Sequence, residues 1–216
     1  MWKRIIRVLS HEINNSLAPI KSISGSLATL VEKRPPPDDL EEDMEKGLSV
    51  IQARAEALGR FMSTYATLAR LPQPQLAPVD VPELVRRVAQ LETRAPVEIR
   101  AGPALVTRAD RDQLEQALIN LIRNAVDATL EAGGGGTVTV GWGARDGTLN
   151  VVIEDEGPGV AETANLFVPF YTTKPGGSGI GLVLSRQIVE GHGGSLELEN
   201  RGDRRGARAR MVLPLE

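Results

Sequence analysis

The sequence of 216 residues contains no cysteine, and aromatic residues make up only 3% of it. Without cysteine the chain can form neither a disulfide nor a thiolate metal site, and this composition fits a reducing compartment. The scarcity of aromatic side chains leaves leucine, isoleucine, valine and alanine to build the core. Hydrophobic residues (41%) and charged residues (25%) occur at the levels of an ordinary globular protein.

The sequence also lacks long hydrophobic runs and an excess of charge of one sign. No apolar run approaches the roughly 20 residues that span a bilayer, and no signal peptide is visible. The formal net charge of −3 gives no general basic surface for nucleic acid. The basic stretch Arg201–Arg210 favours a solvated hairpin over a polyanion site. We therefore expect a soluble, cytoplasmic chain that contacts neither nucleic acid nor membrane by itself.

The first third of the sequence predicts two long helices. Apolar residues recur at helical spacing from residue 3 to residue 33, and Pro35–Pro37 must end that helix. Asp38 or Asp39 can cap a second helix. The second helix carries a heptad seam, formed by Met44, Leu48, Ile51, Ala55, Leu58, Met62 and Tyr65.

Two such helices cannot bury both apolar faces as a lone hairpin. Pairing two hairpins into a four-helix bundle solves that problem, so the pattern predicts a homodimer through a domain at residues 1–71. The alternative is a hairpin that packs on the second domain of its own chain.

A proline-rich linker is expected at residues 72–78, followed by a second domain at residues 79–216. Helices are predicted at 80–92, 110–131 and 180–190, and short strands at 97–99 and 105–107. Further strands are predicted at 137–142, 149–155, 195–200 and 207–213. Strands and helices mixed in this way indicate a two-layer α/β sandwich.

One of the two histidines lies in the helical run Leu9–Leu17. The imidazole of His11 is a nucleophile that can carry a phosphoryl group, and Glu12 stands beside it. Asn15 follows four residues later and shares the helix face of His11. Most histidines on helices are only packed or solvated, so this run alone decides little. The other histidine, His192, is expected to be a turn residue between a helix and a strand.

Four short motifs follow in the second domain. On the long helix, Asn120 and Asn124 leave the same face, and their amide oxygens suit a hydrated Mg²⁺ that also binds phosphates. A solvated face is the plain alternative. The run Asp155–Gly159 comes directly after a strand, where a carboxylate can accept a hydrogen bond from an exocyclic amine. A simple turn is the alternative there.

The third and fourth motifs are an aromatic cluster and a glycine-rich loop. The cluster at 167–174 is the densest in the chain and leads into a lysine, although it also fits a core plug. The loop at 176–182 opens a helix, where free backbone N–H groups bind anions. It is neither a P-loop nor a Rossmann fingerprint.

In this order the four motifs resemble the ATP-binding domain shared by histidine kinases, type II topoisomerases, Hsp90 chaperones and MutL proteins. With the box around His11 and the hairpin, the whole chain resembles the dimerisation and catalytic core of a bacterial two-component sensor histidine kinase. The fold class implied is α+β. It consists of an antiparallel helical hairpin that forms a dimeric four-helix bundle, followed by a two-layer α/β sandwich ATP-binding domain.

The resemblance implies that ATP, with Mg²⁺, phosphorylates His11, and that the phosphoryl group passes to an aspartate of a response-regulator receiver domain. It assigns Glu12 the role of base. A polar residue at the position of Asn15 can orient water for dephosphorylating the regulator, so both kinase and phosphatase activities are expected.

The resemblance also assigns the nucleotide site. Asn124 and Asn120 are implied to hold Mg²⁺ and phosphate, and Asp155 to bind the adenine amine. Gly157 and Gly159 are implied to shape the base pocket. The remaining nucleotide-binding residues implied by the match are Asp127, Phe167, Phe170, Thr173, Lys174, Gly177, Ser178, Gly179, Ile180, Gly181 and Leu182.

The chain departs from the family pattern in two ways. Asn14 and Ser16 stand where relatives usually carry a basic residue and a proline, and loss of that proline removes a kink after His11. Only about ten residues precede His11, whereas the family places a sensor upstream, so we expect an excised core or a short stand-alone kinase. Two rival functions are a serine or protein kinase of the same ATP-binding class and a non-catalytic dimeric scaffold.

Overall fold

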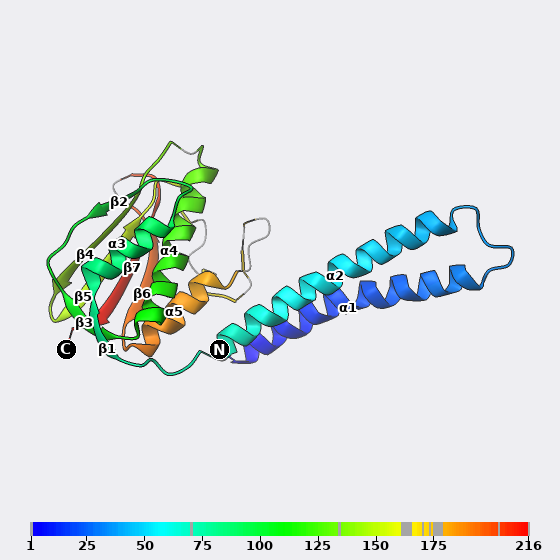
Figure 1. The fold of residues 1–216 in the computed structure, drawn as a ribbon, viewed down its shortest axis with the longest axis horizontal. Coiled ribbons are helices and arrows are strands. Elements are labelled where there is room, and N and C mark those ends of the chain that lie inside the picture. The colour runs from blue at the N-terminus through cyan, green and yellow to red at the C-terminus, as the bar shows by residue number, and fades with distance from the viewer. Residues whose placement is uncertain are drawn as a thin grey trace. The chain divides into compact units, whose positions relative to one another are not determined.

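The computed structural model describes residues 2–69, 71–133, 135–160, 166–169, 171–172, 174, 179–202 and 204–215, without the side chains of 2–12, 60, 63–65 and 67–69. The chain divides into two compact units, Met1–Arg70 and Leu71–Glu216. The first is helical and the second mixes helices with strands (Figure 1).

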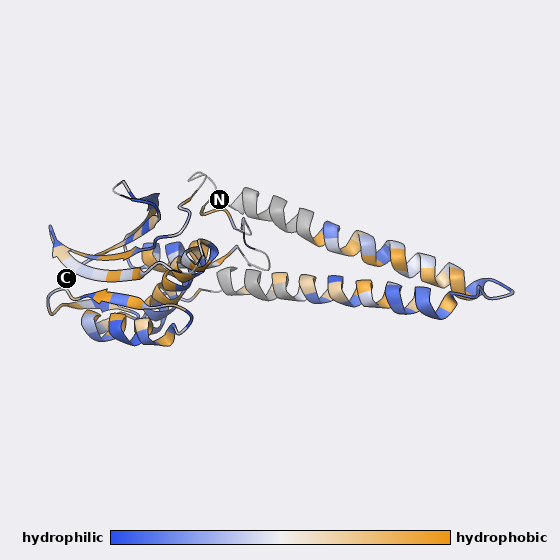
Figure 2. Ribbon diagram, turned by 90° about the horizontal axis from the view of Figure 1, so that it is seen from above, coloured by the Kyte–Doolittle hydropathy of each residue, from blue (hydrophilic) through white to orange (hydrophobic). Residues whose placement is uncertain are grey.

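The first unit is a hairpin of helices α1 (Trp2–Glu32) and α2 (Leu40–Ala69). The two helices lie side by side along their length in both views (Figures 1 and 2). Leu27 of α1 is buried, at 8% exposure, and it packs where α2 carries Gly47. A Cβ atom added at Gly47 would lie 2.8 Å from Leu27 Cδ2, so the missing side chain makes room for the leucine.

Helix α1 contains a proline that the sequence reading overlooked. Pro19 lies inside the helix, three residues after Ser16. A proline in a helix interior has no N–H to donate to the carbonyl four residues earlier, and its ring crowds that carbonyl. Ser16 therefore does not leave the helix after His11 without a proline, because Pro19 follows in the same helix.

The second unit is built on a mixed sheet of five strands in the order β2–β4–β5–β7–β6. Strands β2 and β4 are parallel, and the other neighbours are antiparallel. Two further strands, β1 and β3, pair with each other as a separate antiparallel ribbon. The strand bounds are β1 Ala77–Asp80, β2 Val97–Arg100, β3 Val106–Ala109, β4 Val138–Arg145, β5 Thr148–Glu154, β6 Ser195–Asn200 and β7 Ala207–Pro214.

Three helices, α3 (Val81–Leu91), α4 (Arg111–Glu131) and α5 (Gly181–Gly191), complete this unit. Alternate residues of the strands are buried, as expected of a sheet covered on one face (Figure 2). The register aligns them, because Val151 of β5 lies opposite Trp142 on one side and Met211 on the other. The observed arrangement is the predicted two-layer α/β sandwich.

Capping residues mark the start of α3 and α4 and the end of α5. The side chains of Asp80 and Asp110 accept hydrogen bonds from backbone N–H groups of the first turns of α3 and α4. At the end of α5, His192 is the C-cap residue, as the turn prediction expected. Its Nε2 accepts a hydrogen bond from the Asp110 N–H (2.9 Å), and its Nδ1 lies 2.7 Å from the Ile188 carbonyl oxygen. This histidine therefore joins α5 to the start of α4.

The sequence missed strand β1 and ended β4 too early. Ala77 and Pro78 fall in the segment expected to be linker, yet they pair with β3. The segment before them is tied to α4, because Gln113 donates to the Pro72 carbonyl and the Gln75 N–H donates to Asp110. A short strand that contains a proline has no clear sequence pattern. Within the described residues, no helix combines the length and apolar character needed to cross a lipid bilayer.

The core of the second unit is expected to depend on α4. Leu118 is 1% exposed and Leu130 of the same helix is 40% exposed. We predict that Leu118→Ala lowers the free energy of unfolding by about 2–5 kcal/mol, whereas the control Leu130→Ala changes it by about 0.5 kcal/mol or less. Urea unfolding followed by Trp142 fluorescence in a Trp2→Phe background measures both. Equal losses in the two variants would contradict the assignment of this core.

Candidate nucleotide site

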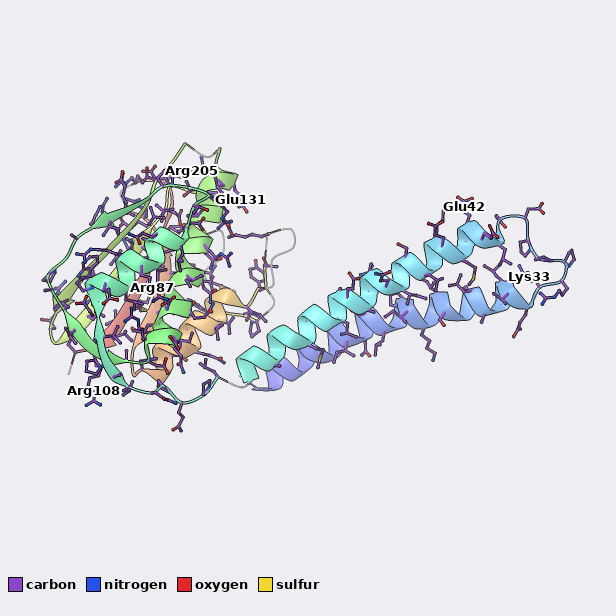
Figure 3. The ribbon with its side chains drawn as sticks, in the orientation of Figure 1. Lys33, Glu42, Arg87, Arg108, Glu131 and Arg205 are labelled. Atoms are coloured by element: carbon purple, nitrogen blue, oxygen red, sulfur yellow. The ribbon has the colours of Figure 1, made fainter. Side chains whose placement is uncertain are left out.

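The second unit contains a cavity of about 690 Å³. Residues of α4 from Asn120 to Glu131 line it, together with segments before α5 and the start of that helix. Glu131 is labelled in Figure 3. Four apolar side chains of the sheet line it, namely Ile153, Leu198, Ala207 and Ala209. The volume suits a drug-sized or nucleotide-sized ligand, and the apolar lining suits a flat ring system.

Asp155 is the buried carboxylate of this cavity. It follows the last residue of β5 and is 6% exposed. Its Oδ1 atom accepts two hydrogen bonds, from the Gly157 N–H (2.9 Å) and the Ala207 N–H (3.0 Å). No hydrogen bond reaches Oδ2 from the described part of the chain. One oxygen is thus used to hold the side chain still, and the other is left to bind a donor on a ligand.

Burial raises the pKa of the Asp155 carboxyl. The two backbone hydrogen bonds and the positive charges of Arg201 and Lys174 work in the opposite direction. These groups stabilise the ionised form, which is the form that can accept two hydrogen bonds on each oxygen.

Gly157 and Gly159 serve different purposes. A Cβ atom on Gly157 would lie 2.7 Å from Ala128 Cβ and 2.8 Å from the Ala128 carbonyl. Its glycine lets the turn approach α4, and it does not line the cavity. Gly159 does line the cavity and has φ of +84°, a conformation that side chains disfavour.

The two asparagines of α4 both line the cavity. Asn120 is engaged, since its Oδ1 accepts from Gln116 (3.3 Å) and its Nδ2 donates to the Gly181 carbonyl (3.5 Å). Asn124 makes no side-chain hydrogen bond within the described residues. The structure thus brings the predicted pair together at the cavity wall, with the Asn124 amide the less constrained of the two.

Asp127, one turn further along α4, is held between two cations. Lys174 Nζ lies 2.9 Å from one carboxylate oxygen, and Arg94 lies 2.7 Å from the other. Burial works to raise the pKa of Asp127, but the hydrogen bonds to Lys174 and Arg94 lower it. The aromatic-to-lysine segment is thereby connected to α4 at the edge of the cavity.

Arg94 lines the cavity, and sequence reasoning missed it. Its guanidinium forms a two-point hydrogen bond with Glu92 (2.7 and 3.0 Å) and reaches Asp127 with a third N–H. The hydrogen bonds from Arg94 also lower the pKa of Glu92. No sequence motif marks Arg94, because its partner on α4 is thirty-three residues away.

The glycine-rich loop is described from Gly179 onward. Gly179 has φ of +64°, Ile180 is 3% exposed, and Gly181 begins α5. Among the described residues no side chain caps this helix, so its first N–H groups are left to bind an anion. Gly179, Ile180, Gly181 and Leu182 all line the cavity. The predicted residues Gly177 and Ser178 lie outside the described residues.

The aromatic motif is described in part. Phe167 does not line the cavity, and the Arg186 guanidinium lies over its ring at 4.7 Å from the centroid. Tyr171 and Thr172 line the cavity instead. Phe170 and Thr173 were also predicted site residues and lie outside the described residues.

The three residues predicted on the hairpin belong to the other unit. His11 and Glu12 lie in α1, and their side chains are outside the described set. Asn15, four residues after His11, is exposed. The structure therefore groups the nucleotide-site residues and leaves His11 on a separate unit.

Two residues at the end of β6 that belong to none of the four motifs make hydrogen bonds to the backbone of cavity-lining residues. Asn200 exchanges two hydrogen bonds with the backbone of Val160 (2.7 and 2.9 Å), next to Gly159. Arg201 donates to the Asp155 carbonyl at 3.2 Å, and its side chain is only 3% exposed. The expectation of a solvated basic hairpin is therefore wrong for Arg201, because this arginine is buried behind the site.

Residues 109–216 match the family of histidine kinase-, DNA gyrase B- and HSP90-like ATPases. The chain is 30% identical to the nitrogen regulation protein NtrY of Azorhizobium caulinodans over 100% of its own length and 29% of that protein. It is 32% identical to the sensor histidine kinase ZraS of Klebsiella oxytoca, over 96% of the chain and 45% of ZraS. The chain thus spans less than half the length of these relatives.

Solved structures agree with this relation. Full-length ShkA in complex with AMPPNP has a TM-score of 0.63 and 27% identity, over 97% of this chain and 45% of that one. The histidine kinase ThkA in complex with the response regulator TrrA has a TM-score of 0.65 over 98% of this chain and 61% of that one, and at 24% identity it supports the fold alone. The chain belongs to the histidine kinase-, DNA gyrase B- and HSP90-like ATPase family and, within it, to the two-component sensor histidine kinases.

Proposed function

We propose that this chain is an ATP-dependent protein-histidine kinase core that phosphorylates itself on His11 and passes the phosphoryl group to an aspartate of a response regulator. The observation that carries the proposal is Asp155, a buried carboxylate with one oxygen unused by the described protein, at the wall of a nucleotide-sized cavity. The relation to ZraS and NtrY supports the choice of histidine as the phosphorylated residue.

Adenine binding follows from the donor and acceptor pattern of the cavity. The exocyclic amine of adenine donates to Oδ2 of Asp155, and the ring lies against the apolar side chains of Ile153 and Ala209. Gly159 allows the backbone to approach the ring because it has no side chain. A carboxylate whose other oxygen is fixed by two N–H groups loses little freedom when the base binds.

The polyphosphate is placed along α4 and the start of α5. The N–H groups at the start of α5 and the Lys174 ammonium neutralise its charge, and Asn124 and Asn120 supply neutral oxygens to a Mg²⁺. No cluster of three or more His, Cys, Asp or Glu side chains occurs among the described residues, so this ligand set fits an ion that takes its other ligands from phosphate and water. Bound Mg²⁺ supplies neutralisation of the charge that develops on the phosphates.

The transfer itself forms one bond and breaks another. An imidazole nitrogen of His11 attacks the γ-phosphorus of ATP, the bond to the β–γ bridging oxygen breaks, and ADP leaves. Glu12 accepts the imidazole proton, a role that rests on the family resemblance. In the second step, an aspartate oxygen of the regulator attacks the phosphorus, the bond between phosphorus and the His11 nitrogen breaks, and His11 takes back a proton to regain its neutral form. Asn15, exposed on the same helix face as His11, orients the water that later dephosphorylates the regulator.

Homodimerisation through the hairpin explains its surface. Leu48 and Met62 of the heptad seam are 53% and 43% exposed in the single chain, and Leu17 of α1 is 47% exposed. A second hairpin that covers these side chains would complete a four-helix bundle. The apolar seam is thus the surface on which we place the partner copy.

The histidine assignment is tested by the acid stability of the label. Incubation with Mg-ATP is expected to give an acid-labile, base-stable phosphate on the chain, absent in His11→Ala and in Asn124→Ala. The His11→Ala chain is expected to bind ADP like the natural chain, because the cavity lies in the other unit. Acid-stable phosphate that survives in His11→Ala would instead favour a serine or other protein kinase of the same ATP-binding class.

The adenine assignment is tested by Asp155→Asn. Asparagine keeps the oxygen that accepts from Gly157 and Ala207 but presents an NH₂ group to the adenine amine. We expect ADP affinity to fall roughly tenfold to a hundredfold, measured by isothermal titration calorimetry. Unchanged ADP affinity in this variant would contradict the assignment.

The thermal stability of Asp155→Asn should not fall together with its ADP affinity. Because burial raises the pKa of Asp155 above its unfolded value, the folded protein holds the proton more tightly. The ionised carboxylate therefore costs stability above the folded pKa, and the cost disappears as the pH falls through it. We expect Asp155→Asn to unfold at pH 7.5 at a temperature equal to or above that of the natural chain, measured by differential scanning calorimetry.

The dimer is tested by placing a charge on the seam. Leu48→Glu is expected to raise the dimer Kd at least about tenfold, because association would bury an unpaired carboxylate. The neighbouring variant Ser49→Glu is exposed and lies off the seam, so it serves as the control. Size-exclusion chromatography with light scattering across a dilution series measures both, and equal dimer stability in the two variants would contradict the proposed face.

A further inference from the structure

Arg201 is a buried arginine with no place in any nucleotide-binding motif. It follows the last residue of β6, and its side chain is 3% exposed. Its guanidinium donates to the Asp155 carbonyl at 3.2 Å and lies 3.5 Å from Glu154 Oε2. It therefore contacts the backbone of the adenine-binding residue and the carboxylate of the residue before it.

Glu154 offsets the free-energy cost of burying Arg201. It faces away from the cavity, because side chains alternate along β5. Arg208 contacts its Oε1 atom (2.7 Å), and Arg100 contacts its Oε2 atom (3.2 Å). Burial works to raise the pKa of Glu154, but hydrogen bonding to Arg208 and the charges of the three arginines lower it. Glu154 is thus ionised at neutral pH and offsets the charge of the buried Arg201.

The backbone of Asp155 is tightly packed against the segment that leads into β7. The Asp155 N–H donates to the Ala207 carbonyl at 3.0 Å. A Cβ atom on Gly206 would lie only 2.0 Å from the Asp155 carbonyl oxygen, and Gly206 has φ of +122°. The guanidinium of Arg201 and the backbone of Gly206 therefore both contact the Asp155 carbonyl group. These two contacts fix the backbone of Asp155 and hence the direction of its side chain.

We propose that Arg201 is a positioning residue for nucleotide recognition: it fixes the end of β5 from the outer face of the sheet and so holds Asp155 in place for the base. Its positive charge also works to lower the pKa of the Asp155 carboxyl. This inference rests on the proposed binding of adenine by Asp155. Lys174 is another cation that favours the ionised carboxyl. The other charged groups near this end of β5 are Glu154 with its arginines and Glu156, which pairs with Arg204.

The pH profile of ADP binding separates this role from a purely structural one. In Arg201→Met, we expect ADP affinity at pH 8 to fall about tenfold, because the carbonyl of Asp155 loses its buried donor. The acid limb, where affinity is lost as Asp155 takes up a proton, should move to higher pH than in the natural chain. Titration of the ADP phosphates is common to all variants and does not affect this comparison.

Arg205 provides the matched control. It lies in the same basic stretch but is exposed, and its side chain is labelled in Figure 3. Arg205→Met removes the same charge from an exposed position just before β7, and we expect its ADP affinity and acid limb to match those of the natural chain. A shift of equal size in both variants would overturn the proposal, because it would reflect net charge alone.

Arg201→Lys keeps the test meaningful if Arg201→Met does not fold. Lysine retains the charge but cannot contact Glu154 and Asp155 with a planar fork, so ADP affinity should fall while the acid limb stays near that of the natural chain. Natural affinity in Arg201→Lys, or an unmoved acid limb in a folded Arg201→Met, would overturn the inference. Failure of the natural chain to bind ADP would overturn the proposed function instead.

Discussion

The second unit is organised around a buried carboxylate, which the proposed adenine contact requires in its charged form. Asp155 stands where β5 ends, and burial raises its pKa. Two backbone N–H groups offset this by binding one oxygen. Those groups belong to Gly157 and Ala207, so the turn after β5 and the start of β7 are both held by the same side chain. The cavity wall, the turn and the strand pairing therefore depend on one set of hydrogen bonds.

The same constraint explains Gly157 of the run Asp155–Gly159 and two residues that no motif contains, Gly206 and Arg201. Gly157 allows the turn to approach Ala128 of α4, and Gly206 allows β7 to approach the Asp155 carbonyl. Arg201 holds that carbonyl from the other face of the sheet. On the side proposed for the polyphosphate, Asp127 plays a similar part, because it joins Arg94 and Lys174 at the edge of the cavity. The proposed nucleotide site is thus made of motif residues and of surrounding residues that hold them in place.

The helices were the most predictable part of the fold. Their apolar spacing and caps placed α3, α4 and α5 within a residue or two of their observed bounds. Strand β1 was missed because it is four residues long, contains Pro78 and gains its stability from β3.

The sequence by itself determined the helical hairpin with its apolar seam, the mixed second domain, and the membership of Asn120, Asn124 and Asp155 in one ordered set of motifs. Those conclusions rest on local spacing and on residue chemistry, which the chain carries without folding. Tertiary structure decided which groups surround those residues: Gly157 against α4, Arg94 beside Asp127, and Arg201 buried behind Asp155. Each of these contacts joins segments far apart in sequence, so only the packing of the sheet and its helices creates them.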